Sequence, residues 1–247
     1  MSLSDYKVAL VTGASSGVGL ACVEALRCAG VEVVALARRE ERLARLAEET
    51  GCETLVMDLT NTDAIYEQLA SRQFDILINN AGLGRGHDGF FSTSASEIDE
   101  MMDLNVRAAI HVVHAVAAGM VERGYGHIVQ IGSITGLYPL GFTAYGATKG
   151  AIHLFAQNLR MDLKGTRVRQ TEICPGRIQT EFFDTAFKSA EEKEQFLSGF
   201  TPLMPENIAE AAMYALDTPW SVNVSMIELT ATEQIPGGVS IERARDV

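Results

Sequence analysis

Short apolar runs alternate with helix-like stretches along the first third of the chain. These runs are rich in Val, Leu and Ile, and they cover residues 7–12, 31–37, 53–57 and 74–78. Such runs are typical of strands that are buried on both faces of a parallel sheet. Helical patterns separate them, at 20–29, 40–49 and from Asn61 or Thr62 to about 71. Strand and helix therefore alternate, which predicts a doubly wound α/β fold.

The rest of the chain continues this alternation. Further strands are predicted at 127–132, 166–174 and 222–230. Further helices are predicted at 97–123, 144–164 and 205–216. Because no repeat, linker or low-complexity block marks a second domain, we expect residues 1–247 to form a single Rossmann-like domain with a parallel sheet of about seven strands. Within it, 182–199 is a candidate substrate lid, and 231–247 is a C-terminal tail without strong periodicity.

The helix predicted at 97–123, which we expect to bend near Asn105, is apolar around most of its circumference from 106 to 121. Such a helix has to be covered on several sides, and the sheet covers only one. A second subunit would cover another side, so we expect an oligomer. His111 and His114 lie in this helix without an evident third ligand, and we interpret them as packed or interface residues.

Composition narrows the class of protein. The net charge is -12 and the sequence pI is about 4.9, which disfavours a broad surface for nucleic acid or an anionic membrane. We expect no apolar run to reach membrane-spanning length, and the first residues lack the layout of a secretory signal, so we expect a cytoplasmic protein. The four cysteines show no metal-ligand spacing, so we expect no metal and no disulfide.

A glycine-rich turn follows the first strand and opens a helix. It reads Gly13-Ala14-Ser15-Ser16-Gly17-Val18-Gly19. Glycines let the backbone approach a pyrophosphate, and the helix N-terminus offers unpaired N–H groups and the positive end of a dipole. A tight connection is the simpler alternative, but a strand before the turn and a helix after it favour a dinucleotide site.

Two arginines, Arg38 and Arg39, end the second strand, where dinucleotide folds meet the adenosine ribose. An acidic residue there would hold the 2′-hydroxyl of NAD, whereas arginine suits a 2′-phosphate. The sequence therefore favours NADP over NAD. The alternative is that both arginines belong to the solvated start of the next helix.

Tyr145 and Lys149 lie four residues apart in the helix predicted at 144–164, so their side chains share one face. A positive charge near a phenol favours the phenolate and lowers its pKa, which would make Tyr145 an acid or base near neutral pH. Ser133 ends the fifth strand, at the mouth of the same crevice. Taken alone, a Tyr and a Lys at this spacing also occur by chance on solvated helix faces.

Together these motifs resemble the short-chain dehydrogenase/reductase family over almost the whole chain. The glycine turn matches the family's cofactor turn, Asn79-Asn80-Ala81-Gly82 matches the motif after its fourth strand, and Pro175-Gly176 with Thr180 matches its nicotinamide loop. Asn105, Ser133, Tyr145 and Lys149 match its catalytic residues in order and spacing.

The resemblance implies a role for each catalytic residue. Tyr145 exchanges a proton with the substrate, Ser133 orients the substrate oxygen, Lys149 lowers the pKa of Tyr145 and binds the nicotinamide ribose, and Asn105 holds a water that links Lys149 to solvent. The cofactor contacts that it implies are Gly13, Ser15, Ser16, Gly17, Val18, Gly19, Arg38, Arg39, Asp58, Leu59, Asn80, Ala81, Gly82, Tyr145, Lys149, Pro175, Gly176, Ile178 and Thr180.

A narrower likeness points to the branch of NADP-dependent serine and 3-hydroxy acid dehydrogenases. It rests on segments such as 119–123, 126–129, 144–149 and 158–163. The branch implies a small-molecule substrate and a homotetramer built around the helices at 97–123 and 144–164. Sulfoacetaldehyde and broad carbonyl reductases, a 3-oxoacyl thioester reductase and a catalytically inactive NADP sensor remain alternatives.

Arg177 departs from that branch, which usually has a small or apolar residue after the Pro-Gly. It is a candidate for binding a carboxylate or sulfonate of the substrate, and a salt bridge to Glu181 or Asp184 is the alternative. Arg85, in the loop 83–96 with His87 and Asp88, is a weaker candidate for the same role, and the alternative is an exposed loop side chain.

Overall fold

A parallel sheet of seven strands organises the computed structural model, which describes residues 2–86, 89–182, 184, 187 and 189–235. His87, Asp88 and most of the predicted tail lie outside the described residues. The strands are β1 (Val8–Thr12), β2 (Glu32–Ala37), β3 (Glu53–Val56), β4 (Ile76–Asn79), β5 (Gly126–Ile131), β6 (Val168–Pro175) and β7 (Met226–Leu229). Their order is β3-β2-β1-β4-β5-β6-β7, and every pair is parallel. The strand order reverses between β1 and β4, because β2 and β3 are added on one side of β1 and β4 to β7 on the other, and this is the switch point of a doubly wound sheet.

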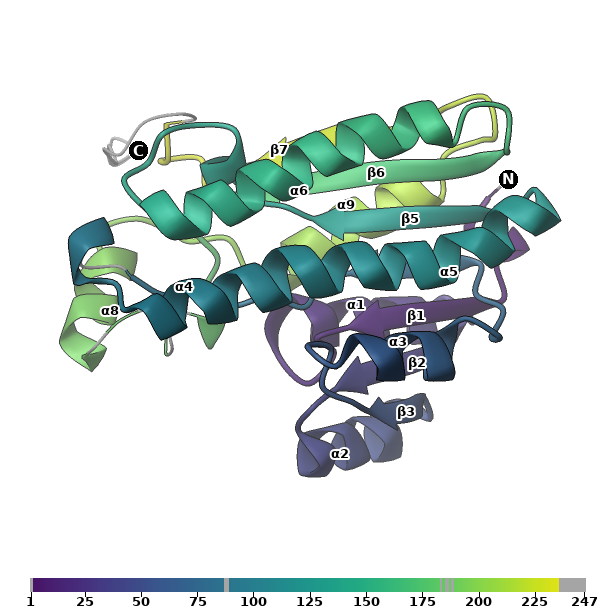
Figure 1. Cartoon of the computed structure of the whole chain (residues 1–247), viewed down its shortest axis with the longest axis horizontal. Coiled ribbons are helices and arrows are strands. Elements are labelled where there is room, and N and C mark those ends of the chain that lie inside the picture. The colour runs from purple at the N-terminus through teal and green to yellow at the C-terminus, as the bar shows by residue number, and fades with distance from the viewer. Residues whose placement is uncertain (1, 87–88, 183, 185–186, 188, 236–247) are drawn as a thin grey trace, which may run out of the picture.

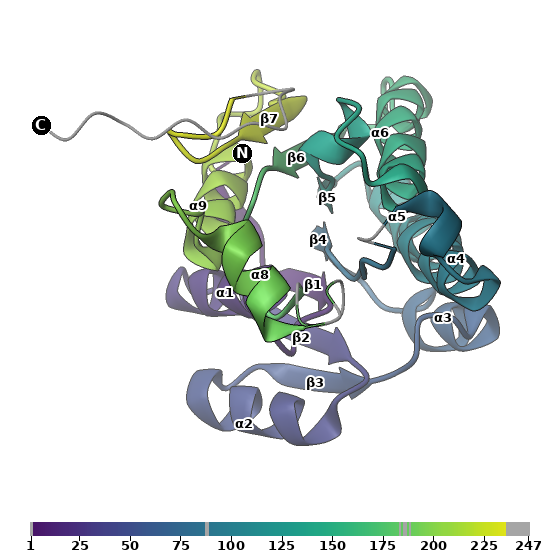
Figure 2. The ribbon, with the colours of Figure 1, turned by 90° about the vertical axis from the view of Figure 1, so that its left-hand side faces the viewer.

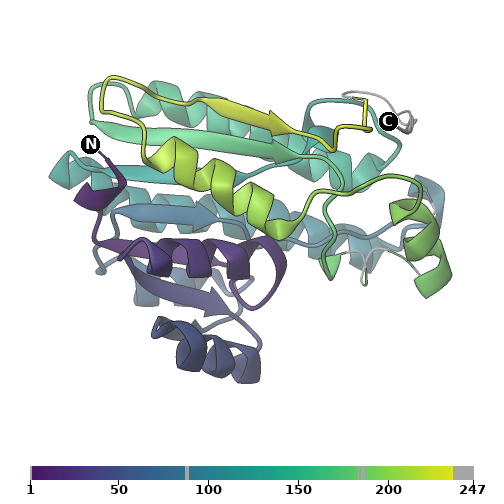
Figure 3. The same ribbon diagram turned by 180° about the vertical axis from the view of Figure 1, so that it is seen from behind.

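Helices cover both faces of the sheet (Figure 2). On one face, α1 (Gly17–Cys28), α2 (Glu40–Thr50) and α9 (Pro205–Leu216) pack over one apolar core, and Figure 3 shows this side. On the other face, α3 (Thr62–Leu69), α5 (Ala109–Arg123) and α6 (Thr143–Asp162) pack over a second core and lie in front in Figure 1. The predicted single-domain Rossmann-like fold is confirmed.

Local chemistry accounts for where several helices begin. Asn61 caps α3 by accepting a hydrogen bond from the Ala64 amide at 3.2 Å. α4 (Ala95–Met101) starts two residues before the predicted 97, because Ser94 and Glu97 form a capping box. α9 begins at Pro205, where the missing N–H of proline costs the helix nothing.

The predicted helix at 97–123 is continuous but changes its winding. After α4 the chain forms a π-helix, η3 (Met102–Ala108), and then continues as α5. Asn105, where we predicted a bend, lies in the π-helical turns. Wide turns of this kind are frequent at functional sites.

The same continuous helix corrects our expectation about membrane spans. Ala95–Arg123 comprises 29 residues, and its most apolar window has a mean hydropathy of 1.4, enough to cross a membrane by length and composition. Half of that window is buried inside the protein. A core helix of a globular protein passes the same test, and Val112, Val113 and Met120 of this helix are fully covered by the second core.

The remaining predictions concern two histidines of this helix and the four cysteines of the chain. His111 is half-buried and His114 exposed, and their Nδ1 atoms lie 2.8 and 3.2 Å from the Tyr66 hydroxyl. Of the predicted packed or interface residues, His111 is thus the packed one. All four cysteines are free thiols, and only Cys28 is exposed.

Candidate active site

A pocket of about 640 Å³ opens at the carboxyl ends of the strands. Figure 2 looks onto this end of the sheet, with α8 (Ala190–Leu197) in front of it. Of the residues predicted to form the site, the pocket is lined by Gly13, Ser15, Ser16, Gly17, Val18, Arg38, Arg39, Leu59, Asn80, Ala81, Gly82, Arg85, Ser133, Tyr145, Lys149, Pro175, Gly176, Arg177, Ile178 and Thr180. Gly19, Asp58 and Asn105 were also predicted, but they do not line it.

The glycine turn forms a cradle that side chains would fill. Gly13 has φ +67°, and a Cβ atom there would lie 2.8 Å from Nδ2 of Asn80. A Cβ atom on Gly19 would overlap the carbonyl of Gly13, so Gly19 shapes the turn from behind the pocket. The Asn80 side chain fastens the turn by donating to the Thr12 carbonyl at 2.9 Å. The N-terminus of α1 thus faces open space, and its free N–H groups fit a pyrophosphate.

Arg39 lies directly on this turn. Its Nε atom donates to Oγ of Ser15 at 2.9 Å and its Nη2 atom to Oγ of Ser16 at 2.5 Å. Glu181, from across the pocket, accepts from Arg39 at 3.2 Å and from Arg42 at 2.6 Å. Two guanidinium groups therefore gather at the adenosine end of the pocket, where they fit a 2′-phosphate.

Arg38 and Asp58 behave differently from the prediction for that end. Nη1 of Arg38 lies 3.6 Å from Oδ2 of Asp58, and both side chains are largely exposed. Asp58 also accepts from the backbone and hydroxyl of Thr60, at 2.9 Å each. The Asp58 carboxylate thus accepts hydrogen bonds from its own loop. Of the two predicted neighbours Asp58 and Leu59, Leu59 is the one that lines the pocket.

Tyr145, Lys149 and Ser133 meet at the inner end of the pocket. The two α6 residues share one face, with Nζ of Lys149 5.9 Å from the centre of the Tyr145 ring. Nζ donates to the Ile131 carbonyl at 2.9 Å, which ties the ammonium to the end of β5. Ser133 Oγ accepts from the amide and hydroxyl of Thr135, at 3.2 and 2.9 Å. The ring of Phe182 covers Tyr145, with ring centres 5.5 Å apart.

The pKa of Tyr145 differs from the prediction. Burial raises the pKa of Tyr145 above its ordinary value, and the hydrogen bond with Ser133 opposes that shift only in part. Burial also lowers the pKa of Lys149 to about 8. In the protein alone, desolvation of the phenol therefore outweighs the nearby ammonium, and the phenol of Tyr145 is protonated at pH 7.

Asn105 is buried one layer behind the pocket. Its Oδ1 atom accepts from the Leu83 amide at 2.8 Å, and its Nδ2 atom donates to the Leu83 carbonyl at 2.8 Å and to Thr148 Oγ1 at 3.1 Å. The side chain thus pins the loop after β4 to the helix that carries Lys149.

Arg177 is held by aromatic rings rather than by the predicted carboxylates. Its guanidinium carbon lies 3.7 Å from the centre of the Phe196 ring and 5.7 Å from that of Phe200, and Nη1 donates to the Phe196 carbonyl at 2.9 Å. The salt-bridge alternative is wrong. Glu181 binds Arg39 and Arg42, and Asp184 pairs with Lys193, because the segment after Ile178 bridges to Leu203 instead of coiling back.

Arg85 is mostly covered and pairs with Glu100 at 3.2 Å, so the prediction of an exposed loop side chain is also wrong. Sequence reasoning missed the aromatic wall of the pocket, Phe142, Phe182 and Phe196, and also Gln234, whose Oε1 accepts from the Arg177 amide at 3.0 Å. Gln234 comes from the tail, where no periodicity gave a signal.

Comparison with known proteins agrees with this geometry. The model of the short chain dehydrogenase family matches residues 7–191. The NADP-dependent 3-hydroxy acid dehydrogenase YdfG of Escherichia coli (strain K12) is 38% identical over 246 residues, which covers 96% of this chain and 99% of the relative. Sulfoacetaldehyde reductase 2 of Chromohalobacter salexigens is 34% identical over 250 residues, which covers 96% and 98%.

A solved structure, the closed form of serine dehydrogenase complexed with NADP+, superposes with a TM-score of 0.90 at 38% identity. The superposition covers 96% of this chain and 100% of the other. Fold, site geometry and sequence therefore agree, and the chain belongs to the short-chain dehydrogenase family.

Proposed function

We propose that this protein is an NADP-dependent oxidoreductase that transfers a hydride between nicotinamide and a small hydroxy or oxo acid, such as serine or 3-hydroxypropionate. The observation that carries the proposal is the single pocket that joins the glycine cradle, Arg39 and the Tyr145–Lys149–Ser133 group. The relatives named for NADP-dependent 3-hydroxy acid dehydrogenase and for serine dehydrogenase with NADP+ support the cofactor and the substrate class.

The residues of the chain fit this cofactor. The cradle suits the pyrophosphate, because glycines and the N-terminus of α1 offer backbone donors there. Arg39 and Arg42 suit the 2′-phosphate, which would replace the Glu181 carboxylate that now accepts from both guanidinium groups. Bound NADP supplies the hydride acceptor, or in its reduced form the donor. Gly176 and Thr180 line the same pocket, with Thr180 beside Gly17 of the cradle, and they would position the nicotinamide.

Proton transfer is the part of the reaction that the protein performs. The Tyr145 phenol is placed to exchange its proton with the substrate oxygen, and the Ser133 hydroxyl to orient that oxygen by a hydrogen bond. Lys149 holds positive charge beside the phenol and so favours the phenolate during oxidation. Asn105 fixes the neighbouring Thr148 and thereby the helix turn that carries Lys149.

Arg177 supports an anionic substrate. It lines the pocket, is partly buried, and in the described part of the chain contacts aromatic rings, a carbonyl and an amide oxygen but no carboxylate. Burial without an anion lowers the pKa of Arg177, and a substrate carboxylate would supply the missing charge. Phe196 belongs to α8, so the segment 182–199 would act as a lid that holds this arginine over the substrate.

The substrate proposal is tested by NADP-linked absorbance with serine, 3-hydroxypropionate, 3-hydroxyisobutyrate, isethionate and neutral alcohols. We expect the carboxylates to turn over fastest, and Arg177→Ala to raise their KM about tenfold or more, as for loss of a charged hydrogen bond. Arg72→Ala is the matched control, since Arg72 also stacks on a phenylalanine but lies away from the pocket.

Two other outcomes would replace the substrate class. A preference for isethionate would point to sulfoacetaldehyde reduction, the activity in the name of a 34% identical relative. A preference for neutral carbonyl compounds that is unchanged in Arg177→Ala would exclude an acid as the substrate. A 3-oxoacyl thioester on an acidic carrier protein fits less well, because this chain carries a net charge of -12.

We propose a cytoplasmic homotetramer for the assembly. The outer faces of α5 and α6 expose Val121, Leu154 and Met161, which a second subunit would cover. Light scattering in solution measures the mass directly, and a stable monomer would contradict the proposed assembly without affecting the chemistry.

A further inference from the structure

A buried carboxylate lies behind the active-site lysine and has no assigned role. Glu172 belongs to β6, where its residue pairs with Gln130 of β5, and the residue is only 2% exposed. Within the part of the chain that the structure describes, its Oε1 atom is buried and has no N–H or O–H donor, and the neighbouring Cys174 thiol, a weak donor, is the partner left to the carboxylate on this side. An unpaired charged oxygen is costly, so its retention calls for a positive charge nearby.

The absence of a side chain at Gly132 makes room for this oxygen. A Cβ atom on Gly132 would lie 2.5 Å from Oε1 of Glu172 and 3.2 Å from Sγ of Cys174. Gly132 follows Ile131, whose carbonyl accepts from Nζ of Lys149. The carboxylate therefore lies at the same strand end as the lysine ammonium, and unlike Lys149 it does not line the pocket.

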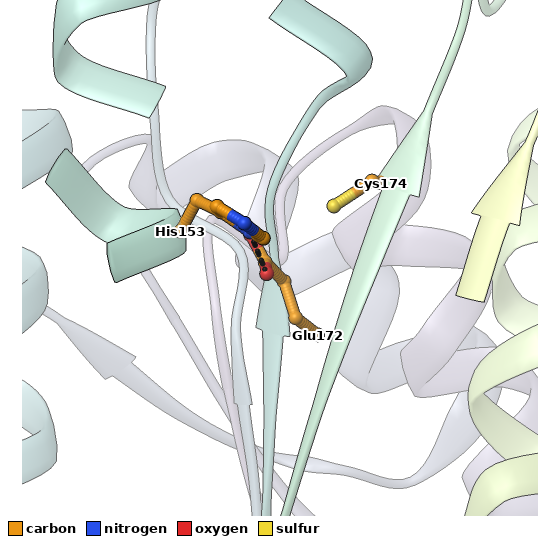
Figure 4. A group of neighbouring side chains, drawn as sticks. All are labelled: His153, Glu172 and Cys174. Atoms are coloured by element: carbon orange, nitrogen blue, oxygen red, sulfur yellow. Dashed lines mark hydrogen bonds and ion pairs between the residues drawn. The ribbon is translucent and has the colours of Figure 1, made fainter. Parts of the chain in front are cut away.

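His153 fixes the other oxygen of the carboxylate (Figure 4). It lies one helical turn after Lys149 on α6, and its Nδ1 atom is 2.7 Å from Oε2 of Glu172. Its Nε2 atom faces the amide nitrogen of Gln157 at 2.7 Å. A ring that donates at Nδ1 and accepts at Nε2 is neutral, so the histidine orients the carboxylate without cancelling its charge.

We infer that Glu172, oriented by His153, is the buried counter-charge that keeps Lys149 protonated, and that both are positioning residues of the site. The inference rests on the proposed role of Lys149 for its effect on turnover, but not for its effect on the lysine. Lys149 contacts the phenol, Glu172 acts on Lys149, and His153 acts on Glu172.

The electrostatics of the lysine agree with this assignment. Burial lowers the pKa of Lys149, while Cys174 and Glu172 oppose the shift. Burial, and then the neighbouring Glu172, raise the pKa of the Cys174 thiol far above neutral. The thiol is therefore uncharged where Lys149 titrates, and of these two neighbours Glu172 is the one that carries charge. The titratable groups facing this space are Tyr145 and His153 from α6, Cys174 from β6 and, one strand further out, Glu228 from β7 with Tyr138.

A metal ion explains the cluster less well. The ligating atoms of His153, Glu172 and Cys174 lie within 4.8 Å of one another, and their types suit zinc. Two ligands of one zinc ion lie about 3.3 Å apart, given bond lengths near 2 Å. The 2.7 Å between His153 and Glu172 is instead a hydrogen-bond distance, and the ammonium of Lys149 would repel a cation.

The test is a titration of Lys149 by NMR in the full chain labelled with 13Cε-lysine, which has only five lysines to resolve. Glu172→Gln keeps the shape and removes the charge, so the Lys149 midpoint should fall by about one pH unit. Glu228→Gln is the matched control, because it removes a carboxylate one strand away and should leave the midpoint in place. An unchanged midpoint in Glu172→Gln overturns the inference.

Two further measurements keep the result interpretable. If Glu172→Gln fails to fold, the 15N shifts of the His153 ring in the wild-type protein decide the matter, since a doubly protonated ring at pH 7 would cancel the carboxylate and overturn the inference. The pH profile of kcat/KM separates the two proposals. If the alkaline limb of the profile moves with the Lys149 midpoint in Glu172→Gln, both proposals are supported. If the midpoint moves and the profile does not, Glu172 is still the counter-charge of Lys149, but Lys149 has no role in the reaction.

Discussion

Two buried cations lie at opposite ends of the strand pair β5 and β6, and they differ in how many hydrogen bonds they donate to the protein. At the amino end, Arg169 donates to the Thr218 carbonyl and hydroxyl, the carbonyls of Leu216 and Val222, and the Tyr6 hydroxyl, at 2.8–3.2 Å. At the carboxyl end, Lys149 donates to a single protein acceptor in the described part of the chain, the Ile131 carbonyl.

The difference separates a structural cation from one that is available for chemistry. Arg169 joins β6 to the end of α9, to the segment before β7 and to the N-terminal Tyr6, and uses most of its donors to do so. Lys149 keeps two of its three N–H donors for other partners, beside a phenol and a buried carboxylate. A buried charged group with few hydrogen bonds to the protein indicates the end of the sheet at which chemistry can take place.

Breaking the amino-terminal cluster should have the largest effect on stability. Arg169→Met removes five hydrogen bonds and leaves buried acceptors unpaired, so we expect a loss of about 3–5 kcal/mol. Urea unfolding followed by circular dichroism measures this loss. Arg72→Met, which breaks an exposed pair with Glu53, should cost about 1 kcal/mol or less, and equal losses in the two variants would contradict the account.

Removing the carboxyl-terminal cation should have a smaller effect of the opposite sign. The pKa of Lys149 falls from 10.5 to about 8, which corresponds to a cost of roughly 3 kcal/mol for holding the charge. The double variant Lys149→Met/Glu172→Gln escapes this cost, loses one hydrogen bond and leaves no buried carboxylate without its counter-charge, so we expect a net gain of about 2 kcal/mol at pH 7, together with loss of activity.

The pH dependence of that gain has a definite sign. Between the folded value and the unfolded value, the unfolded chain binds a proton that the folded chain does not, so the wild type becomes more stable as the pH rises through this range. The two proteins should therefore approach each other in stability from pH 8 to pH 10.5. A gap that is constant or widens over this range would show that burial of the charge is not its cause.

The smallest expected effect concerns His127, beside Arg169. Burial, and then the charge of Arg169, lower the pKa of His127 to about 3. The folded ring stays neutral while the unfolded one is protonated below about 6.5, so stability falls as the pH drops, by about 1 kcal/mol from pH 7 to pH 5.5. His127→Gln should lack this contribution, and unfolding curves with the same pH dependence in both proteins would exclude it.

The sequence predicted the sheet and the cofactor cradle because both depend on local signals. Apolar runs located all seven strands, and Pro205 marked the first residue of α9. The glycine turn is local as well, although α1 begins at Gly17 rather than at the predicted residue 20, because glycine is tolerated in the first turn.

The rest of the site depends on contacts between distant segments. Glu172 and His153 lie 19 residues apart and meet only because α6 packs on β6. Sequence proximity offered a salt bridge to Glu181 as the alternative role of Arg177, yet Glu181 binds Arg39, 142 residues away. The raised pKa of Tyr145 likewise follows from burial, which spacing along a helix does not reveal.

Tyr145→Phe tests the central claim most directly, because it removes one hydroxyl and keeps the ring that packs on Phe182. NADP binding, measured by calorimetry, should be unchanged, while kcat with the best acid from the substrate screen should fall about 100-fold or more, the usual contribution of a positioned acid or base. Turnover within tenfold of the wild type would contradict the assignment of Tyr145 as the proton donor.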